Sequence, residues 1–424
     1  MIARGSGRAA LVAIAIVGLS CTNDVAAPGL CPQFCPLGAL SVVDTVLTTA
    51  ITRDSAYGRP VGYVNPNKSL TLLAATEPGI KDSRPIMRMP PFPASLVLED
   101  TTTGPVVGVD SIIMQITITT RDTTAQNLQL AIYALPVTID STSTFAGLAP
   151  AFAAPPIRTV NVDSLLAMPA DKNLATGDSA LVDTVYHRVT LYLKFDSTQV
   201  PYSVPDTGKL AFGIRVFANQ PTDLALGAVL NFGLGPAITA YLKVDSLGAV
   251  AHRRTALGFG SPTFNSFVFD PPARSLDSTL VIGGVPATRS ILRITFPRIL
   301  RDSQQVARAT LELIPAVLPQ GAPSDSFEIV TQAVLVDLGA KSALDPIHVD
   351  TTKVYITPID TVRIEMTNLM RFWAADTAAP TAIVLRGAPE GANFAELRAF
   401  SSATPAYRPL LHLTYSPSFP FGHR

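Results

Sequence analysis

Hydrophobic and polar side chains alternate along much of this chain. In the run SILRITF, Leu292 and Ile294 fall on one side, and in the run LLHLTY, Leu411 and Leu413 do the same. Leu311 takes the equivalent place in ATLELIP. Successive side chains of a strand point to opposite faces of a sheet, so this alternation predicts strands with one buried face. Helical periodicity is scarce, so we expect an all-β protein of antiparallel sheets with these leucines in its core.

Five of the predicted strands have counterparts earlier in the chain, in the same order. The pairs are RPIMRM (from Arg84) with RSILRI (from Arg289), VDSIIMQI (from Val109) with VARATLEL (from Val306), VTLYL (from Val189) with VRIEM (from Val362), FGIR (from Phe212) with IVLR (from Ile383), and GPAITAYL (from Gly235) with RPLLHLTY (from Arg408). This repeated order predicts an internal duplication. We expect two tandem antiparallel β-sandwich domains of jelly-roll type, a first repeat at 40–246 and a second at 252–417, with a tail at 418–424.

The first repeat is longer than the second. Much of the excess lies in Ala134–Val160, which is rich in Ala, Pro, Ser and Thr. This composition predicts a long loop or an excursion at a sheet edge.

The segment TNLMRFW predicts a short helix between two strands of the second repeat. Thr367 or Asn368 is a suitable N-cap. Leu369 and Trp373 are four positions apart, so they share one face of such a helix. Because Leu369 is apolar, we interpret the only tryptophan of the chain as a plug of the core and not as a surface that stacks on a ligand.

The first residues have the pattern of an export signal. Arg4 and Arg8 precede an apolar run, Ala9–Leu19, that is too short to span a bilayer as a helix. Small residues follow, and the run stops close to Cys21. The pattern is close to a bacterial lipobox, which predicts a signal peptide at 1–20 and a lipid on Cys21.

An ordinary secretory signal, cut after Ala27, is the alternative. With a lipid on Cys21, residues 21–39 form a flexible tether that contains Cys31 and Cys35. Three residues separate these cysteines, which does not fit a C-x-x-C redox motif, and no histidine lies near them to complete a metal site. The pair therefore predicts a local disulfide in an oxidising compartment.

Composition narrows the classes of function. Hydrophobic residues make up 47% of the chain and charged residues 15%, and the formal net charge is +0. Nucleic acid attracts proteins with clustered positive charge, so no nucleic-acid partner is expected. No segment after the signal is apolar for long enough to span a bilayer, so membrane attachment is expected through the lipid alone.

Motifs for catalysis and for cofactors are missing from the sequence. The five histidines are scattered, and no metal-hydrolase, nucleophile-elbow or phosphate-loop spacing occurs. Glycoside hydrolysis needs two carboxylates across a cleft, and Glu390 and Glu396 are a close pair of glutamates. We interpret them as parts of a turn and of the strand that follows it, and not as a catalytic pair. Aspartate followed by Ser or Thr recurs singly, as at Asp140 and Asp196, which favours turns over a calcium site. We expect no enzyme activity, no metal and no cofactor.

Four segments of the second repeat match a known pattern: RSILRITF, ATLELIP, VRIEMTNLMRFW and the closing YRPLLHLTY. Over 255–417 they resemble the DNRLRE-type β-sandwich modules of secreted bacterial and archaeal proteins, and Trp373 falls on the tryptophan of that family's pattern. The family's Asn-Tyr-Gly opening and its S-R-E run are absent here. Some members bind polysaccharides as carbohydrate-binding modules and others have no known role. The resemblance therefore implies a fold and leaves the ligand open.

We expect a non-catalytic, lipid-anchored protein of the cell envelope, at the outer membrane, or a secreted protein if Cys21 carries no lipid. The expected partner is an extracellular polysaccharide or another envelope component. A purely structural or adhesive envelope protein is the alternative, and an exported polysaccharide-active enzyme is a weaker third. Exposed aromatic rings on one sheet face favour glycan binding, a smooth face rich in Ser and Thr favours a structural role, and two carboxylates across a cleft favour an enzyme.

Overall fold

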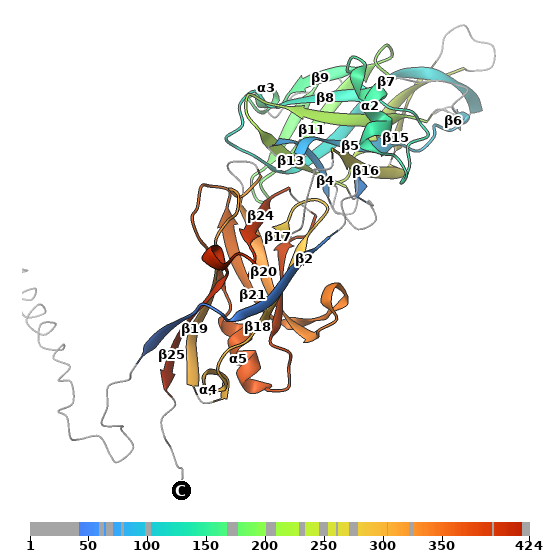
Figure 1. Cartoon of the computed structure of the whole chain (residues 1–424). Coiled ribbons are helices and arrows are strands. Elements are labelled where there is room, and N and C mark those ends of the chain that lie inside the picture. The colour runs from blue at the N-terminus through green and yellow to red at the C-terminus, as the bar shows by residue number, and fades with distance from the viewer. Residues whose placement is uncertain are drawn as a thin grey trace, which may run out of the picture.

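The computed structural model describes most of the chain after its N-terminal segment. The described residues are 42–58, 63–64, 71–77, 80–97, 103–167, 177–200, 209–228, 234–245, 253–259, 262–270, 279–302, 304–321, 326–391 and 394–417. They form an all-β protein of antiparallel sheets, as the alternating pattern predicts. Two β-sandwich-like units, called unit A and unit B, lie end to end (Figure 1). Within these residues, no helix is both long and apolar enough to cross a membrane.

Unit B contains residues 42–57 and 279–417 and has two facing sheets. The first has four strands in the order β1 (Val43–Leu47), β25 (Leu410–Pro417), β19 (Gln304–Leu313) and β22 (Val362–Glu365). The second has five, in the order β2 (Ile51–Tyr57), β18 (Arg289–Ile294), β23 (Ala382–Ala388), β20 (Ser326–Val336) and β21 (Ala343–Tyr355). Strands β17 (Thr279–Gly283) and β24 (Glu396–Phe400) pair at the end nearest unit A, and helices α4 (Arg298–Asp302) and α5 (Thr367–Ala375) lie at the other end (Figure 1).

One buried cluster fills the space between the two sheets of unit B. It contains all the residues that the sequence predicts as core: Leu292, Leu311, Leu369, Trp373, Leu411 and Leu413. Each of them is at most 1% exposed. The ring of Phe296 packs against Trp373 with centroids 5.9 Å apart. Burial of one such side chain contributes about 1.5–3 kcal/mol, so this cluster supplies much of the stability of the unit.

Helix α5 forms where the sequence predicts it, but its first turn is held differently. Met366 precedes the helix, and neither Thr367 nor Asn368 caps it with its own side chain. Instead, the carboxylate of Asp350 on β21 accepts hydrogen bonds from the backbone N–H groups of Asn368 (3.0 Å) and Leu369 (3.4 Å). The first N–H groups of a helix need acceptors, and here a neighbouring strand supplies them. The predicted N-cap is therefore wrong.

Unit A contains residues 63–270 and has two layers that share hydrogen-bonded strands. One layer has the order β15 (Arg253–Phe259), β14 (Ala237–Val244), β7 (Thr103–Arg121), β11 (Arg188–Asp196) and β10 (Ser179–Asp183). The other has the order β16 (Phe264–Phe269), β5 (Ile80–Arg88), β12 (Ala211–Phe217), β8 (Gln129–Ala134) and β9 (Arg158–Asn161). Strands β4 (Thr71–Glu77) and β13 (Thr222–Gly227) join β5 to the far end of β7, while β3 (Tyr63–Val64) pairs with β16 and β6 (Ser95–Val97) pairs with β7.

The long segment Ala134–Val160 contains a helix that the sequence pattern does not predict. Helix α2 (Phe145–Ala153) is capped by Thr144, whose hydroxyl accepts a hydrogen bond from the N–H of Gly147 (3.1 Å). Phe152 packs on Tyr133 of β8, with ring centroids 5.0 Å apart. The segment then reaches strand β9 at the edge of its layer, and helix α3 (Val162–Leu166) follows. The excursion thus ends at a sheet edge, as predicted, and its helix covers the outer face of that layer.

The boundaries predicted for the two domains are wrong for the folded units. Strands β1 and β2 precede unit A in the chain, yet β1 pairs with β25 and β2 pairs with β18. Strands β15 and β16 follow the predicted boundary, yet they pair with β14 and β5 of unit A. Ile51 is part of the core of unit B, and Phe267 is part of the core of unit A. Unit A is therefore inserted into the sequence of unit B, and the units are not arranged in tandem.

Phe394 joins the two units. It lies just before β24 of unit B, is 2% exposed and belongs to the core cluster of unit A. Its ring centroid is 6.3 Å from that of Phe267 and 6.1 Å from that of Phe269, both on β16, in edge-to-face geometry. Such aromatic pairs are worth about 0.5–1.5 kcal/mol each beyond the area they bury, so Phe394 fixes unit B against unit A.

Candidate functional site

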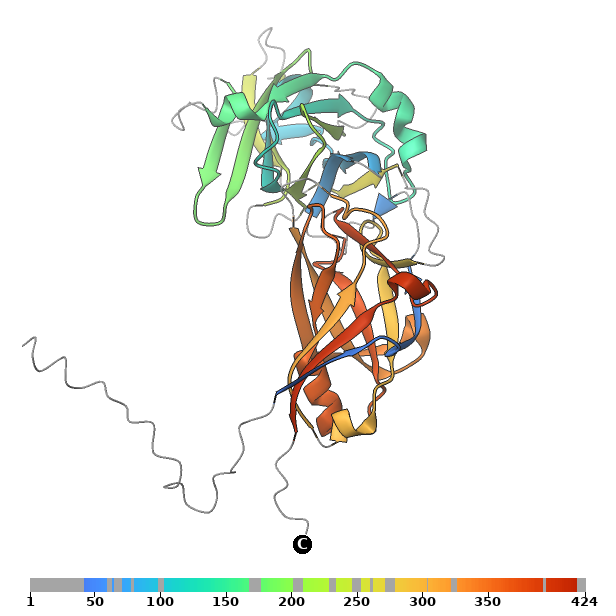
Figure 2. The same cartoon turned by 60° about the vertical axis from the view of Figure 1, so that its left-hand side comes forward.

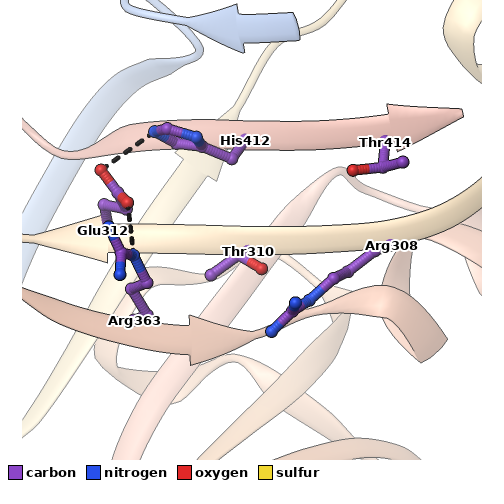
Figure 3. Close-up of a pocket in the computed structure, with 6 residues that line it drawn as sticks. All are labelled: Arg308, Thr310, Glu312, Arg363, His412 and Thr414. Atoms are coloured by element: carbon purple, nitrogen blue, oxygen red, sulfur yellow. Dashed lines mark hydrogen bonds and ion pairs between the residues drawn. The ribbon is translucent and has the colours of Figure 1, made fainter. Parts of the chain in front are cut away.

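Six polar side chains line a shallow depression on the outer face of the four-stranded sheet of unit B (Figure 3). They are Arg308, Thr310, Glu312, Arg363, His412 and Thr414, from strands β19, β22 and β25. The volume of the depression is about 350 Å³. We call this surface the polar face.

The alternation that builds the core also builds the polar face. Leu311 points into the core of unit B, so its neighbours Thr310 and Glu312 point outward. Leu411 and Leu413 point inward in the same way, which leaves His412 outward between them. Because neighbouring strands are aligned side by side, their outward positions form one continuous surface.

Glu312 lies on β19, the middle one of the three strands, at the end of the polar face where Arg363 and His412 meet it (Figure 3). Its side chain is only 12% exposed. One carboxylate oxygen accepts a hydrogen bond from Nε of Arg363 at 2.7 Å, and the other lies 2.9 Å from Nε2 of His412 (Figure 3). The register of the sheet explains the first contact, because Arg363 stands directly opposite Glu312 on the next strand. Charge-assisted hydrogen bonds are about twice as strong as neutral ones, so this contact holds the carboxylate in one orientation.

Two arginines of the polar face extend into solvent. The side chain of Arg308 is 68% exposed and that of Arg363 is 69% exposed. Nε of Arg308 lies 3.6 Å from the carboxylate of Glu365 on β22, which also accepts a hydrogen bond from the N–H of Thr367 (3.1 Å). A guanidinium has five N–H donors in a planar fork, so each arginine retains donors that face solvent.

The first described strand completes the polar face. Asp44 on β1 stands opposite Thr414 on β25, and the Thr414 hydroxyl donates a hydrogen bond to the Asp44 carboxylate at 2.6 Å. Val46 stands opposite His412 and is 47% exposed. The polar face therefore combines strands that are separated by almost the whole sequence.

Exposed aromatic rings do not gather on the polar face. In the part of the chain that the structure describes, the aromatic side chains with large exposed surface are Tyr186, Tyr355 and Tyr407. They lie in the turn after β10, at the end of β21 and in the short helix η3 (Pro405–Tyr407), respectively. The polar face therefore offers hydrogen bonds and charge to a ligand, and no ring on which a sugar stacks.

The two glutamates that the sequence brings close together are held in separate ion pairs. Glu390 accepts two hydrogen bonds of 2.6 Å from the guanidinium of Arg289. Glu396 is 2% exposed and accepts a hydrogen bond of 2.7 Å from Arg398. No group of three or more His, Cys, Asp or Glu side chains with metal-binding geometry occurs among the described residues.

Several aspartates that precede Ser or Thr form turns, as predicted. Asp140 accepts hydrogen bonds from the N–H (2.8 Å) and the hydroxyl (2.6 Å) of Thr142. Asp196 does the same with Thr198, at 2.9 Å and 2.6 Å. The threonine hydroxyl is the main cause that lowers the pKa of each carboxyl below its usual value. Asp350 differs, because it holds the start of α5 and its burial raises its pKa.

An aspartate and a histidine also pair on β21, away from the polar face. Nδ1 of His348 lies 2.6 Å from the carboxylate of Asp345, and this hydrogen bond lowers the pKa of Asp345. The imidazole stacks on Phe372 of α5 with ring centroids 4.2 Å apart. These contacts tie β21 to α5, so we interpret the pair as structural.

Sequence reasoning missed the residues of the polar face. The only signal was their position: Glu312 and His412 flank core leucines on predicted strands. Cys21, Cys31 and Cys35 lie outside the described residues, so the lipid and the disulfide stay predictions.

No protein-family model matches this chain, and a search of curated proteins finds no similar sequence. The resemblance to DNRLRE-type modules therefore rests on the quoted segments alone.

Proposed function

We propose that this chain is a non-catalytic, lipid-anchored protein of the cell envelope, and that its polar face binds a hydroxyl-rich extracellular polysaccharide. One observation carries the proposal: Glu312 is held by a hydrogen bond from Arg363 and lies beside His412 on an open sheet face. The same face carries a second arginine, Arg308, and the hydroxyl of Thr414.

A sugar hydroxyl both donates and accepts hydrogen bonds, so a surface that binds it needs both kinds of group in fixed positions. The polar face supplies donors from the guanidinium groups of Arg308 and Arg363 and an acceptor from the carboxylate of Glu312, and the carboxylate of Glu365 next to Arg308 adds a second acceptor. With Asp44, two positive and three negative side chains lie here, so the net charge is small and binding depends mainly on directional hydrogen bonds. An open depression across several strands suits an extended chain better than an enclosed small molecule.

The arrangement of carboxylates supports binding without catalysis. Hydrolysis of a glycosidic bond ordinarily needs two carboxyl groups that flank the bond from opposite sides. Glu312 and Glu365 lie on neighbouring strands of one sheet, and each of them faces an arginine. Among the described residues that line the depression, Glu312 is the only acid.

A purely structural or adhesive envelope protein is the second candidate. It is favoured by the lack of a cluster of exposed aromatic rings among the described residues. The two candidates differ in one property, since only the first requires Glu312 and its partners to contact a ligand.

A polysaccharide array separates the candidates. The full chain with Cys21→Ser, fluorescently labelled, is applied to neutral and uronate-containing bacterial and plant polysaccharides. Hydrogen bonds to a charged group are worth about 1.5–3 kcal/mol, so Glu312→Gln is expected to weaken binding about tenfold or more.

Glu328→Gln is the matched control. Glu328 is an exposed carboxylate on β20, in the other sheet of unit B, and its substitution is expected to leave binding unchanged. A chain that binds no polysaccharide, or binds equally with Glu312→Gln, contradicts the proposal and favours the structural role.

A further inference from the structure

Units A and B have the same order of strands in their sheets. In unit A, β15–β14–β7–β11 and β16–β5–β12–β8–β9 are neighbours, and in unit B, β1–β25–β19–β22 and β2–β18–β23–β20–β21 are neighbours. The pair β4 and β13 of unit A corresponds to β17 and β24 of unit B. Along the chain, β4, β5, β7, β8, β9, β11, β12, β13 and β14 match β17 to β25 one for one. The shared order includes every strand pair that the sequence comparison identifies.

The register of the matched strands also agrees. Met87 stands opposite Phe212 in unit A, and their sequence counterparts Leu292 and Ile383 stand opposite each other in unit B. Between β7 and β14, Met114 pairs with Ile238, while their counterparts Leu311 and Leu411 pair between β19 and β25. Two unrelated sandwiches have no reason to share both strand order and register, so these agreements support a duplication.

Among the described strands, β3, β6 and β10 of unit A have no counterpart in unit B, and among the matched strands only the first two break the chain order. In unit B, the edge positions next to β25 and β18 are filled by β1 and β2, which come before β4 in the chain. In unit A, the equivalent positions next to β14 and β5 are filled by β15 and β16, which come after β14 in the chain and immediately before β17. By sequence, β1 and β2 open the first repeat, and β15 and β16 open the second.

The equivalent positions of these strands agree in detail. Ser55 on β2 stands opposite Ile291, and Ser266 on β16 stands opposite Ile86, the sequence counterpart of Ile291. The neighbouring pairs, Asp54 with Leu292 and Asn265 with Met87, agree in the same way. Strands β2 and β16 therefore each occupy the position that the other would occupy if the two repeats had kept their own strands.

We propose that the chain is a duplicated sandwich whose two repeats have exchanged their first two strands. Strands β1 and β2 of the first repeat complete unit B, and strands β15 and β16 of the second repeat complete unit A. Figures 1 and 2 show β1 and β2, in blue, lying along unit B, whose other strands are yellow to red. The proposal is independent of any ligand.

The exchange has three structural consequences. Val43 at the start of β1 stands opposite Tyr415 near the end of β25, so the first described strand belongs to unit B, and unit A lies at the other end of that unit (Figure 1). Ala50 and Ile51 lie in the core of unit B, so neither repeat can be cut out at its sequence boundary without the loss of core strands. The exchange also supplies Asp44 to the edge of the polar face.

Engineered disulfides test the exchange. The full chain with Cys21→Ser, Cys31→Ser and Cys35→Ser carries no other cysteine. Asp44→Cys with Thr414→Cys is expected to oxidise to a disulfide-linked monomer, because these residues stand opposite each other and their side chains are in contact. In an unexchanged duplication, Asp44 would instead face Tyr241, the sequence counterpart of Thr414. The pair Asp44→Cys with Tyr241→Cys is therefore expected to stay reduced.

Three outcomes overturn the proposal, in separate ways. A monomeric disulfide between positions 44 and 241 shows that each repeat keeps its own strands. A disulfide between 44 and 414 that forms only in dimers shows exchange between two copies of the chain. Failure of the 44–414 pair to oxidise in a folded chain shows that β1 does not pair with β25. If the first pair prevents folding, the pair Arg53→Cys with Arg293→Cys makes the same test, because these residues stand opposite each other on β2 and β18. Its control is Arg53→Cys with Arg88→Cys, the pair that would face each other without exchange.

Discussion

Replacement of Trp373 by alanine is expected to remove a large part of the stability of unit B. The indole is 0% exposed, lies in the cluster between the two sheets and packs against Phe296. Truncation of a buried tryptophan to alanine costs about 3–5 kcal/mol, because the transfer energy is lost and a cavity remains. A domain is stable by only about 5–15 kcal/mol, so the change is severe.

Replacement by phenylalanine is expected to cost much less. Among the described residues, Nε1 of Trp373 has no hydrogen-bond partner, and an unpaired buried donor itself costs about 1–3 kcal/mol. Trp373→Phe removes this donor and keeps most of the ring volume, so we expect a loss of less than about 2 kcal/mol. Arg371→Ala, on the exposed side of the same helix, is the control and is expected to change stability by less than about 0.5 kcal/mol.

Urea unfolding followed by far-ultraviolet circular dichroism measures these differences. With a urea dependence of about 2 kcal/mol per molar, a loss of about 4 kcal/mol lowers the midpoint of the unit B transition by about 2 M. In the wild-type chain, the fluorescence of this only tryptophan is expected to be blue-shifted and poorly quenched by acrylamide. An easily quenched, red-shifted signal together with an unchanged midpoint for Trp373→Ala would refute the placement of the indole in the core.

Further predictions concern the lipid anchor, the N-terminus of helix α5, the loss of stability at low pH and the boundaries of the repeats. Cys21→Ser is expected to abolish incorporation of labelled palmitate, and equal labelling would favour ordinary secretion. Asp350→Ala removes the acceptor at the start of α5 and is expected to cost about 1 kcal/mol in urea unfolding. The hydrogen bond with His348 lowers the pKa of Asp345. The stability that the ionised Asp345 contributes is therefore fully present above the ordinary pKa of 3.8 and is lost as pH falls through the lowered pKa. Asp345→Asn should flatten the decline of melting temperature between about pH 5 and about pH 2, and an unchanged decline would contradict this role. An isolated 252–417 segment is expected to lack a cooperative transition, because it lacks β1 and β2.

Local pattern was sufficient to predict the strands and the core of unit B. Alternation alone places Leu311 and Leu413 inward, because the side-chain period of a strand is fixed by its geometry. The helical segment around Trp373 was also predicted from spacing. Its N-cap was not, because Asp350 is remote in the sequence and reaches the first turn of α5 only through the packing of β21.

The partners of β1 and β2 could not be predicted from the sequence. Both β1 and β15 suit the same edge position, and nothing local to either strand specifies which unit it joins. That choice depends on how the chain connects the two units in space. The polar face was missed for a similar reason, since the meeting of Glu312, Arg363 and His412 depends on the register of three strands.

Hydrogen–deuterium exchange of the full chain, with and without the polysaccharide that binds most strongly on the array, tests the binding role of the polar face most directly. We expect slower exchange in peptides from β19, β22 and β25, and no change in peptides from β20 and β21 of the other sheet. Glu312→Gln is expected to remove this protection at the same polysaccharide concentration, and Glu328→Gln is expected to retain it. Protection confined to unit A, or protection that survives Glu312→Gln, would show that the polysaccharide binds elsewhere.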